Sequence, residues 1–480
     1  MAMELYYRNA EIKLIQRQLW LSKEQRSRMT VVTGKSGAGK TALVCKALEK
    51  EPFLYFRAGG KTSHLLLQEY KNQVSEKLGL YIPSKVVTFP TLLSHLFDSA
   101  YKRHMSIIID NFDLLASKEP DFVPFLADLW DENRRGSHVN LILITRNIFV
   151  TNQIFDNQES PLVNAADCRI TLNYFTVSQL KELLLYKGPN HTSEDLLALY
   201  MTTGGMPALT MSVLKATDCS KEQIYKYLLS PDSPCESAAR ALLADTLGKN
   251  SEVYLSILQL IACGHQSQAA IEAGLGGIII GGHLAKLETE YQLVTKMRPV
   301  LADAASRNVV RYNITNLFLL FWLKYIESNR ATIETSGYET IIPKALADFE
   351  PSGRDVLLRY FIQKFSEENS ITAIGGDWPA VKPSRNQSRR RGYYLSNTSK
   401  SRTSVAPKKS NSPKVAAPEE DNQTYIVALA DRKNKALFAD VCLHASDFKK
   451  APFLERLATL KKGPLKGCTI DSRVFTIEDM

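Results

Sequence analysis

The sequence predicts an α/β fold in which a parallel sheet is covered by helices, followed by a mainly helical region and a small α/β region. Three observations predict it. Strand and helix patterns alternate up to residue 172. The apolar run 106–110 ends in a carboxylate, as buried parallel strands often do. A glycine-rich stretch, 34–41, stands between a β-branched run and a helical pattern.

The glycine-rich stretch matches the pattern G-x-x-x-x-G-K-[ST] in full. Its glycines allow a tight turn, so that backbone N–H groups and the start of the next helix point at phosphate oxygens. Lys40 is expected to reach the β- and γ-phosphates, and Thr41 to offer its hydroxyl to Mg²⁺. The expected ligand is therefore ATP with Mg²⁺. The residues expected to bind it here are Gly34, Ser36, Gly37, Ala38, Gly39, Lys40 and Thr41.

The nucleotide-binding region is expected to consist of an amphipathic helix followed by alternating strands and helices. The strands are expected at 29–33, 52–58, 106–110, 139–145 and 168–172. The helices are expected at 6–21, 42–50, 61–78, 90–103 and 121–134. In such a fold the ligand chemistry collects at the carboxyl ends of the parallel strands.

Two of these strand ends carry candidate catalytic residues, which act together with Lys40. Asp110 follows the apolar strand in the manner of a Walker B aspartate and is expected to hold Mg²⁺ with Thr41. Arg146 follows the fourth strand, where a sensor of the γ-phosphate usually lies; the alternative is a solvated loop arginine. The residue after Asp110 is Asn111, which cannot accept a proton from water. The pattern predicts nucleotide binding with slow hydrolysis or none.

Beyond the nucleotide-binding domain, at 1–175, the sequence predicts a helical lid at 176–234 and a winged-helix domain at 235–335. The winged helix rests on three short helical stretches followed by two extended ones. Its third helix offers His283 and Lys286 but no Arg, Asn or Gln for base edges, so packing between domains is favoured over DNA reading. The last domain is expected at 336–480.

The net charge of +10 comes from one segment. Residues 380–418 contain ten basic side chains and no acidic one, so the rest of the chain is formally neutral. We expect the insertion 379–422 to be disordered, because it has few large apolar residues. An alternative hypothesis is a DNA-associated protein that uses basic residues 382–414 and the winged helix.

The remaining composition indicates a cytoplasmic protein without a membrane segment. The seven cysteines are scattered, which favours reduced thiols over disulfides or structural zinc. The N-terminus lacks the pattern of a signal peptide. The longest apolar run, 317–323, is far too short to cross a bilayer. The oligomeric state stays open, an oligomer included.

With these motifs in order, the chain resembles the prokaryotic STAND-like, AAA-related P-loop ATPases that carry a winged helix and a C-terminal domain similar to restriction endonucleases. The resemblance rests on the phosphate loop, the strand 107–115, the stretches 160–162 and 204–207, and the helix 318–322. It implies an ATP-dependent switch, and it places Gly205 and Pro207 near the adenine side of the nucleotide.

The chain departs from this family at both of its candidate sites. The family usually has Glu where this chain has Asn111, and Gly-Arg where it has Asn164-Ala165, so the resemblance implies at most a weak ATPase. Nuclease-competent relatives carry Glu-Ile-Asp and Glu-x-Lys on two strands. Of these candidate metal ligands only Asp440 and Glu350 remain here, which predicts an inactive nuclease, with a metal-dependent nuclease as the unfavoured alternative.

Overall fold

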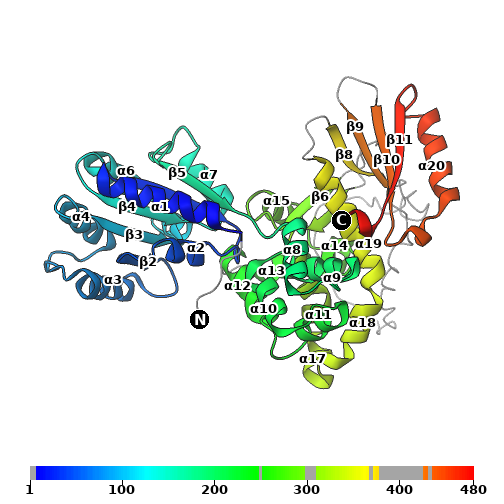
Figure 1. Ribbon diagram of the computed structural model, residues 1–480, viewed down its shortest axis with the longest axis horizontal. Helices are drawn as coiled ribbons and strands as arrows, with labels where there is room; N and C mark the ends of the chain where they lie inside the picture. The colour runs from blue at the N-terminus through cyan, green and yellow to red at the C-terminus, as the bar shows by residue number, and fades with distance from the viewer. Residues whose placement is uncertain (1–6, 248–250, 298–309, 367–370, 378–424, 431–434) are drawn as a thin grey trace, which may run out of the picture.

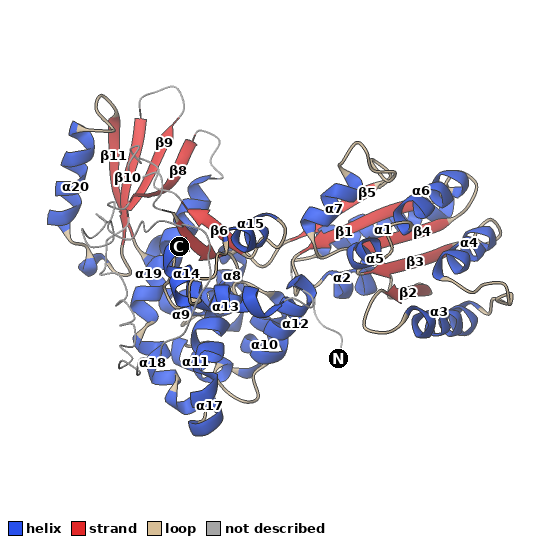
Figure 2. Cartoon of the chain, turned by 180° about the vertical axis from the view of Figure 1, so that it is seen from behind, coloured by secondary structure: helices blue, strands red, loops and turns tan. Residues whose placement is uncertain are grey.

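The computed structural model describes residues 7–247, 251–297, 310–366, 371–377, 425–430 and 435–480. An α/β domain formed by the first part of the chain lies at one end of the molecule and is joined through a narrow connection to a helical body (Figure 1). A second, smaller sheet lies against the other end of that body, as the reverse view also shows (Figure 2). The insertion 379–422, including basic residues 382–414, lies outside the described residues.

The N-terminal domain is built on five parallel strands, in the order β2-β3-β4-β1-β5. Their bounds are Arg28–Gly34 (β1), Phe53–Arg57 (β2), Met105–Asp110 (β3), Val139–Ile144 (β4) and Cys168–Leu172 (β5). This confirms the predicted α/β class and each predicted strand within two residues. The order places β1, and the phosphate loop that follows it, between β4 and β5.

Alternate residues of the central strands face two separate cores, as strand geometry requires. Val32, Ile108 and Ile142 pack with α1 (Asn9–Glu24) and α2 (Lys40–Ala47) on one face. Val31 and Ile107 belong to the core of the other face. That face is covered by α3 (Ser63–Leu78), α4 (Phe89–Ser99), α5 (Phe112–Lys118), α6 (Phe122–Asn133) and α7 (Ile148–Phe155). Helices α5 and α7 were not among the predicted elements.

The helical body begins after β5 and contains the elements expected of the lid and the winged helix. The lid helices are α8 (Val177–Lys187), α9 (Ser193–Thr203), α10 (Pro207–Ala216) and α11 (Lys221–Leu228). They are followed by α12 (Cys235–Leu247), α13 (Ser251–Ala262), α14 (Gln268–Gly274) and α15 (Gly281–Thr289). Two strands, β6 (Val294–Met297) and β7 (Arg311–Ile314), then pair in antiparallel fashion. The predicted order of three helices and a ribbon is present; α12 was not predicted.

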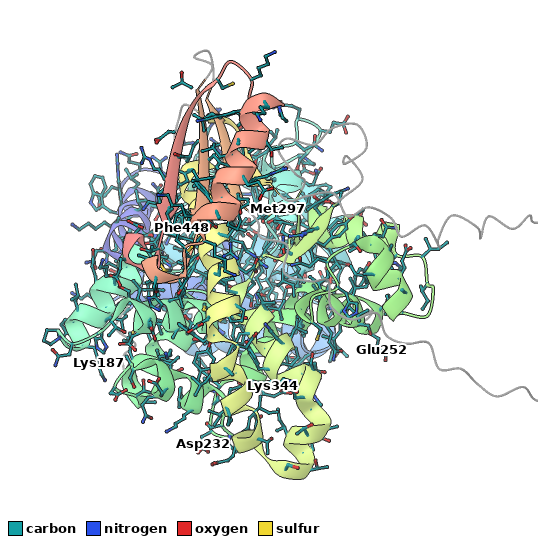
Figure 3. The ribbon with its side chains drawn as sticks, turned by 90° about the vertical axis from the view of Figure 1, so that its right-hand side faces the viewer. Lys187, Asp232, Glu252, Met297, Lys344 and Phe448 are labelled. Carbon is teal, nitrogen blue, oxygen red and sulfur yellow. The ribbon has the colours of Figure 1, made fainter. Side chains whose placement is uncertain are left out.

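The apolar run 317–323 forms the short helix α16 (Leu317–Phe321), which continues directly as a π-helical turn, Trp322–Ile326. Its aromatic side chains are buried in the helical body, as expected of core residues. The chain continues through α17 (Arg330–Ser336), α18 (Ile342–Ala347) and α19 (Phe349–Ser366). Figure 3 looks onto this end of the body, with Lys344 of α18 labelled below the small sheet.

The C-terminal sheet has four strands in the order β11-β10-β9-β8. The antiparallel pair β9 (Tyr425–Ala430) and β10 (Lys435–Val441) confirms the expected hairpin, whose turn lies outside the described residues. Helix α20 (Lys450–Lys462) and β11 (Thr469–Phe475) were also expected, whereas β8 (Ile371–Asp377) was not. No helix among the described residues is long and apolar enough to span a membrane. None of the seven cysteines forms a disulfide.

Candidate functional site

The phosphate loop joins the carboxyl end of β1 to the first turn of α2 and requires glycine at several positions. Gly37 and Gly39 have positive φ values of 79° and 88°, which side chains of L-residues rarely adopt. A Cβ at Gly37 would also lie 2.8 Å from Sδ of Met206, a residue of the helical body. The sequence therefore folds this stretch as a tight loop that exposes its backbone to a ligand and contacts the connection between α9 and α10.

The Lys40 side chain folds back over the loop. Its ammonium donates hydrogen bonds to the carbonyl oxygens of Gly34, at 2.6 Å, and Lys35, at 2.9 Å. The side chain is buried at the start of α2. The positive charge is thus held at the end of the loop where the pattern requires it.

Asp110 lies at the carboxyl end of β3, beside Thr41 and Tyr55. Its Oδ2 atom accepts hydrogen bonds from the Thr41 hydroxyl, at 2.8 Å, and the Tyr55 hydroxyl, at 2.5 Å. The Oδ1 atom accepts from the backbone N–H of Asn111 at 2.8 Å. A hydroxyl and a carboxylate at this separation are the oxygen donors that Mg²⁺ prefers. The pair therefore fits the metal that the sequence predicted.

Tyr55 was not predicted as a site residue. Burial, and after it the hydrogen bond to Asp110, raises the pKa of the Tyr55 hydroxyl, which therefore remains a donor. Tyr55 lies in β2, and an aromatic residue in a predicted strand is normally expected to belong to the hydrophobic core. Only the pairing of β2 with β3 places it next to the carboxylate.

Asn111 is held by its backbone conformation and by a side-chain hydrogen bond. Its backbone is left-handed, with φ 61°, a conformation that Asn tolerates better than most residues. The side-chain amide donates to the carbonyl of Ala58 at 3.0 Å, and the residue is buried. The side chain is thus fixed against the end of β2 and has no group able to take a proton from water.

Asp113, the next carboxylate, is turned toward the end of β4. Its Oδ2 atom accepts the backbone N–H groups of Arg146, at 3.1 Å, and Asn147, at 2.8 Å. These bonds fix the backbone of the loop that carries Arg146. The Arg146 side chain lines a small cleft together with Lys35 and Ser36 of the phosphate loop, so the structure does bring this residue to the loop.

Gly205 and Pro207 lie at the junction of the α/β domain and the helical body. Gly205 has φ 71°, and a Cβ on it would lie 2.2 Å from the carbonyl oxygen of Phe175. Its own carbonyl accepts from the Phe175 N–H at 2.8 Å. Pro207 opens α10. A cavity of about 620 Å³ next to them includes Gly204 and reaches Lys35, and its volume lies in the usual range of ligand pockets.

Tyr174 links the phosphate loop to the segment that follows β7. Its hydroxyl donates to the carbonyl of Ser36 at 2.6 Å and accepts from the side-chain amide of Asn316 at 3.3 Å. Asn316 in turn caps α16 through the N–H of Leu319 at 3.0 Å. Burial raises the pKa of Tyr174, so the hydroxyl keeps its proton. This chain of hydrogen bonds runs from the loop to the helical body.

The predicted remnant of a nuclease site is occupied by an internal ion pair. Asp440 of β10 is fully buried, and its Oδ1 atom lies 3.1 Å from the guanidinium of Arg354 in α19. Arg354 also donates to the carbonyl of Val441 at 2.7 Å. Glu350 is exposed. Among the described residues, no group of three or more His, Cys, Asp or Glu side chains is arranged to hold a metal ion.

The third helix of the expected winged helix, α15, turns Leu284 and Leu287 into the core. The ring of His283 packs edge-on against Tyr254, with ring centroids 5.3 Å apart. Lys296 is exposed on β6, with its ammonium 6.0 Å from the ring of Tyr312. Among the described residues of α15 and β6, the exposed basic side chains that a phosphate could contact are Lys286 and Lys296.

One protein family matches part of the chain. The family model described as an AAA domain matches residues 23–151, the stretch that contains the phosphate loop, Asp110 and Arg146. Among curated proteins, no sequence matches this chain.

Solved structures with a similar course of the chain include a Walker-type ATPase of Pyrococcus abyssi. It is 15% identical, with a TM-score of 0.48, over 67% of this chain and 96% of that chain. The ORC2 protein of Aeropyrum pernix is 14% identical, with a TM-score of 0.42. The match covers 72% of this chain and 96% of the ORC2 chain. A signal transduction ATPase with numerous domains from Pyrococcus horikoshii is 15% identical, with a TM-score of 0.32. The match covers 76% of this chain and 48% of that protein's chain.

Proposed function

We propose that this chain, which carries an AAA-type P-loop ATPase domain, binds ATP with Mg²⁺ and acts as a nucleotide-dependent switch with slow hydrolysis. The observation that carries the proposal is a complete phosphate loop beside a strand end that lacks a general base. The hydrogen bonds of Lys40 to the loop and of Thr41 to Asp110 support binding, whereas Asn111 cannot accept a proton. Asp113 is engaged with the backbone of Arg146 and Asn147.

In this proposal each residue has a separate task. The loop from Gly34 to Gly39 presents backbone N–H groups to the phosphates, and Lys40 exchanges its two carbonyl contacts for phosphate oxygens. Thr41 and Asp110 hold Mg²⁺, whose charge offsets that of the phosphates. Arg146 contacts the γ-phosphate, and Gly205 and Pro207 lie on the adenine side.

A switch also requires that the nucleotide change the arrangement of the helical body. The contacts that support this are Met206 against Gly37 and the hydrogen-bonded chain from Ser36 through Tyr174 to Asn316. Because both contacts depend on the shape of the phosphate loop, a change in the loop alters the packing of the lid and of α16. Such order changes around a γ-phosphate are a known mode of switching.

Titration of the full chain with ATP and Mg²⁺ tests the binding step. Lys40→Ala is expected to weaken ATP binding at least roughly tenfold, since it removes a charged donor from the phosphates. Lys46→Ala is the matched control, because Lys46 is exposed on the same helix and pairs with Glu49 at 2.6 Å. Equal affinity for all three proteins would refute nucleotide binding at the loop.

A second candidate function is DNA association, with the nucleotide stabilising the fold. The observation that favours it is the concentration of ten basic residues, without an acidic one, in 380–418. DNA binding through this segment should weaken steeply with salt and should be lost on deletion of residues 382–414. If the deleted chain binds DNA as well as the full chain at every salt concentration, this candidate is wrong.

We further propose that the C-terminal sheet is not a nuclease. Arg354 places a positive charge on the only buried carboxylate of the expected metal site, where a nuclease would bind a cation. Burial, and after it the charge of Asp440, raises the pKa of Cys442 to about 11, so this thiol stays protonated at neutral pH. Incubation of DNA with the protein and Mg²⁺ or Mn²⁺ is expected to give no cleavage; cleavage lost in Asp440→Ala would contradict the proposal.

A further inference from the structure

Strand β11 forms one edge of the C-terminal sheet. Among the described residues it pairs only with β10, in parallel and in unbroken register from Thr469 to Phe475. It lies on the side of the small sheet that faces away from the N-terminal domain (Figure 1). The outer side of an edge strand presents unpaired backbone N–H and C=O groups, which are a template for pairing with another strand.

The middle of this edge strand is accessible. Asp471, Ser472 and Arg473 are exposed. Helix α20 packs on one face of the sheet through residues such as Phe453, and of β11 it covers Ile470 in part. The helix therefore lies beside the start of the strand, and the residues around Ser472 are open to a second chain.

The direction of the backbone groups in β11 follows from one hydrogen bond. The carbonyl of Phe475 accepts the N–H of Cys442, which directly follows β10, at 2.9 Å. The backbone groups of Phe475 thus point toward β10. Because the backbone groups of alternate residues in a strand point to opposite edges, those of Ile470, Ser472 and Val474 point outward.

Two opposite charges flank the central serine on one face of the strand. Asp471 and Arg473 form an ion pair at 2.8 Å, and their side chains are 56% and 57% exposed. On the other face Ile470 and Val474, both half-buried, flank Ser472 in the same way. This pattern is self-complementary, because a copy of the strand turned end to end presents a positive charge opposite Asp471 and a negative charge opposite Arg473.

We propose that β11 pairs in antiparallel fashion with β11 of a second copy of this chain, about a two-fold axis through Ser472. Such an axis makes the contact isologous, so the assembly closes as a dimer. Each Ser472 exchanges backbone hydrogen bonds with the partner's Ser472. Ile470 lies opposite the partner's Val474, and Asp471 lies opposite the partner's Arg473.

The charges and the backbone favour the same register. With the axis at Ser472, the outward N–H and C=O groups of both strands meet. Asp471 and the partner's Arg473 then form a pair without backbone hydrogen bonds, the kind in which side chains lie closest. An axis through Asp471 or Arg473 would place that residue opposite its own copy, and like charges directly opposite each other destabilise a sheet.

This contact is independent of the nucleotide site. The edge contains no residue of the phosphate loop, and the N-terminal domain lies at the far end of the molecule (Figure 1). Dimer formation therefore requires no nucleotide, so this proposal and the proposed switch fail separately. Because an interface made mainly by one strand is small, we expect a weak dimer, with a dissociation constant of about 1–100 µM.

Sedimentation equilibrium of the full chain without nucleotide, from roughly 1 to 200 µM, tests the dimer. The molar mass is expected to rise with concentration from that of one chain toward that of two. Asp471→Arg and Arg473→Asp should each weaken association at least roughly tenfold, because by symmetry each substitution puts like charges at both ion pairs. Asp128→Arg, the same reversal at an exposed position of α6, should leave association unchanged.

A mixture of the two charge variants tests the register. The Asp471→Arg chain then carries two positive charges and meets the two negative charges of the Arg473→Asp chain, so a heterodimer of about natural affinity should form. Ser472→Pro removes the outward N–H at the axis, a change that edge strands tolerate, and should abolish association in protein that melts cooperatively.

Three results would overturn the proposal. The natural protein could stay monomeric up to roughly 200 µM, as expected if the two charges only shield the edge from other chains. Association could be unchanged in Asp471→Arg, which would place the contact on another surface. The two charge variants could fail to associate when mixed, which would exclude this register.

Discussion

The carboxylate of Asp113 accepts the backbone N–H of Arg146 at 3.1 Å and so joins the first turn of α5 to the end of β4. The two residues are far apart in sequence, and the contact involves a backbone group of Arg146. It fixes the path of the loop on which the expected γ-phosphate sensor stands. The role of Asp113 is thus to position Arg146, in contrast to the proton acceptor that a carboxylate near Asp110 suggests.

Replacement of Asp113 should therefore affect stability and sensing together. In Asp113→Ala two backbone N–H groups lose their acceptor, so the free energy of unfolding should fall by about 1–3 kcal/mol, as measured with denaturant. The preference for ATP over ADP should also fall, since Arg146 is no longer held in place. Asp128→Ala, at an exposed position of α6, is the control. An unchanged ratio of ATP to ADP affinity in Asp113→Ala would contradict this role.

Removal of the Tyr55 hydroxyl should alter the dependence of nucleotide binding on Mg²⁺. Tyr55→Phe leaves Asp110 without one of the donors that orient its Oδ2 atom. The Mg²⁺ concentration for half-maximal ATP binding should rise roughly two- to tenfold, which is the effect expected from the loss of one hydrogen bond. Tyr81→Phe, at an exposed position, should show no such change. The same Mg²⁺ dependence in Tyr55→Phe and in the natural protein would show that Tyr55 does not orient the carboxylate.

The Tyr174 hydroxyl should transmit nucleotide binding to α16. ATP is expected to slow hydrogen exchange at the amide of Leu319, which Asn316 caps. In Tyr174→Phe this protection should be lost, because the link between Ser36 and Asn316 is broken. Tyr186→Phe, exposed on α8, is the control. Protection of Leu319 by ATP in Tyr174→Phe would show that the signal takes another path.

Acidification should destabilise the N-terminal domain through His104. Burial, and after it the charge of Lys23, lowers the pKa of His104 from 6.5 to about 4. Between these values the unfolded chain binds more protons than the folded one, so stability is full above pH 6.5 and falls as the pH is lowered toward 4. Urea unfolding at several pH values should show this slope. His104→Gln should reduce it, whereas His64→Gln, at an exposed site of α3, should leave it intact.

The five strands of the N-terminal sheet, and the candidate residues at their carboxyl ends, could be predicted because their signals are local; the order of the strands could not. The apolar strand that ends at Asp110 and the glycine pattern before Lys40 are each contained in a few residues. Their meeting in space follows from the rule that parallel strands collect chemistry at one edge. The pair of Thr41 and Asp110 at 2.8 Å is the result.

The contacts that sequence reasoning missed depend on tertiary structure. Tyr55 lies in a strand and Tyr174 just after one. At such positions the sequence pattern is the same whether an aromatic side chain packs in the core or donates a hydrogen bond to a carboxylate or to the phosphate loop. Asp113 and Met206 act through contacts with segments distant in sequence. Helices α5 and α7 are short and follow strands closely, so their sequence pattern resembles that of the loops that connect strands to helices. Strand β8 contains a Gly-Gly pair, which weakens its strand pattern.

The rate of ATP hydrolysis under saturating ATP and Mg²⁺ tests the central claim most directly. Without a general base beside Asp110, the natural protein should turn over well below the rate of about 10 per second typical of enzymes. Asn111→Glu restores the missing carboxylate and should raise the rate in protein that remains folded, although a left-handed backbone at this position costs about 1–2 kcal/mol for such a residue. Turnover of roughly tens per second in the natural protein would contradict a slow switch.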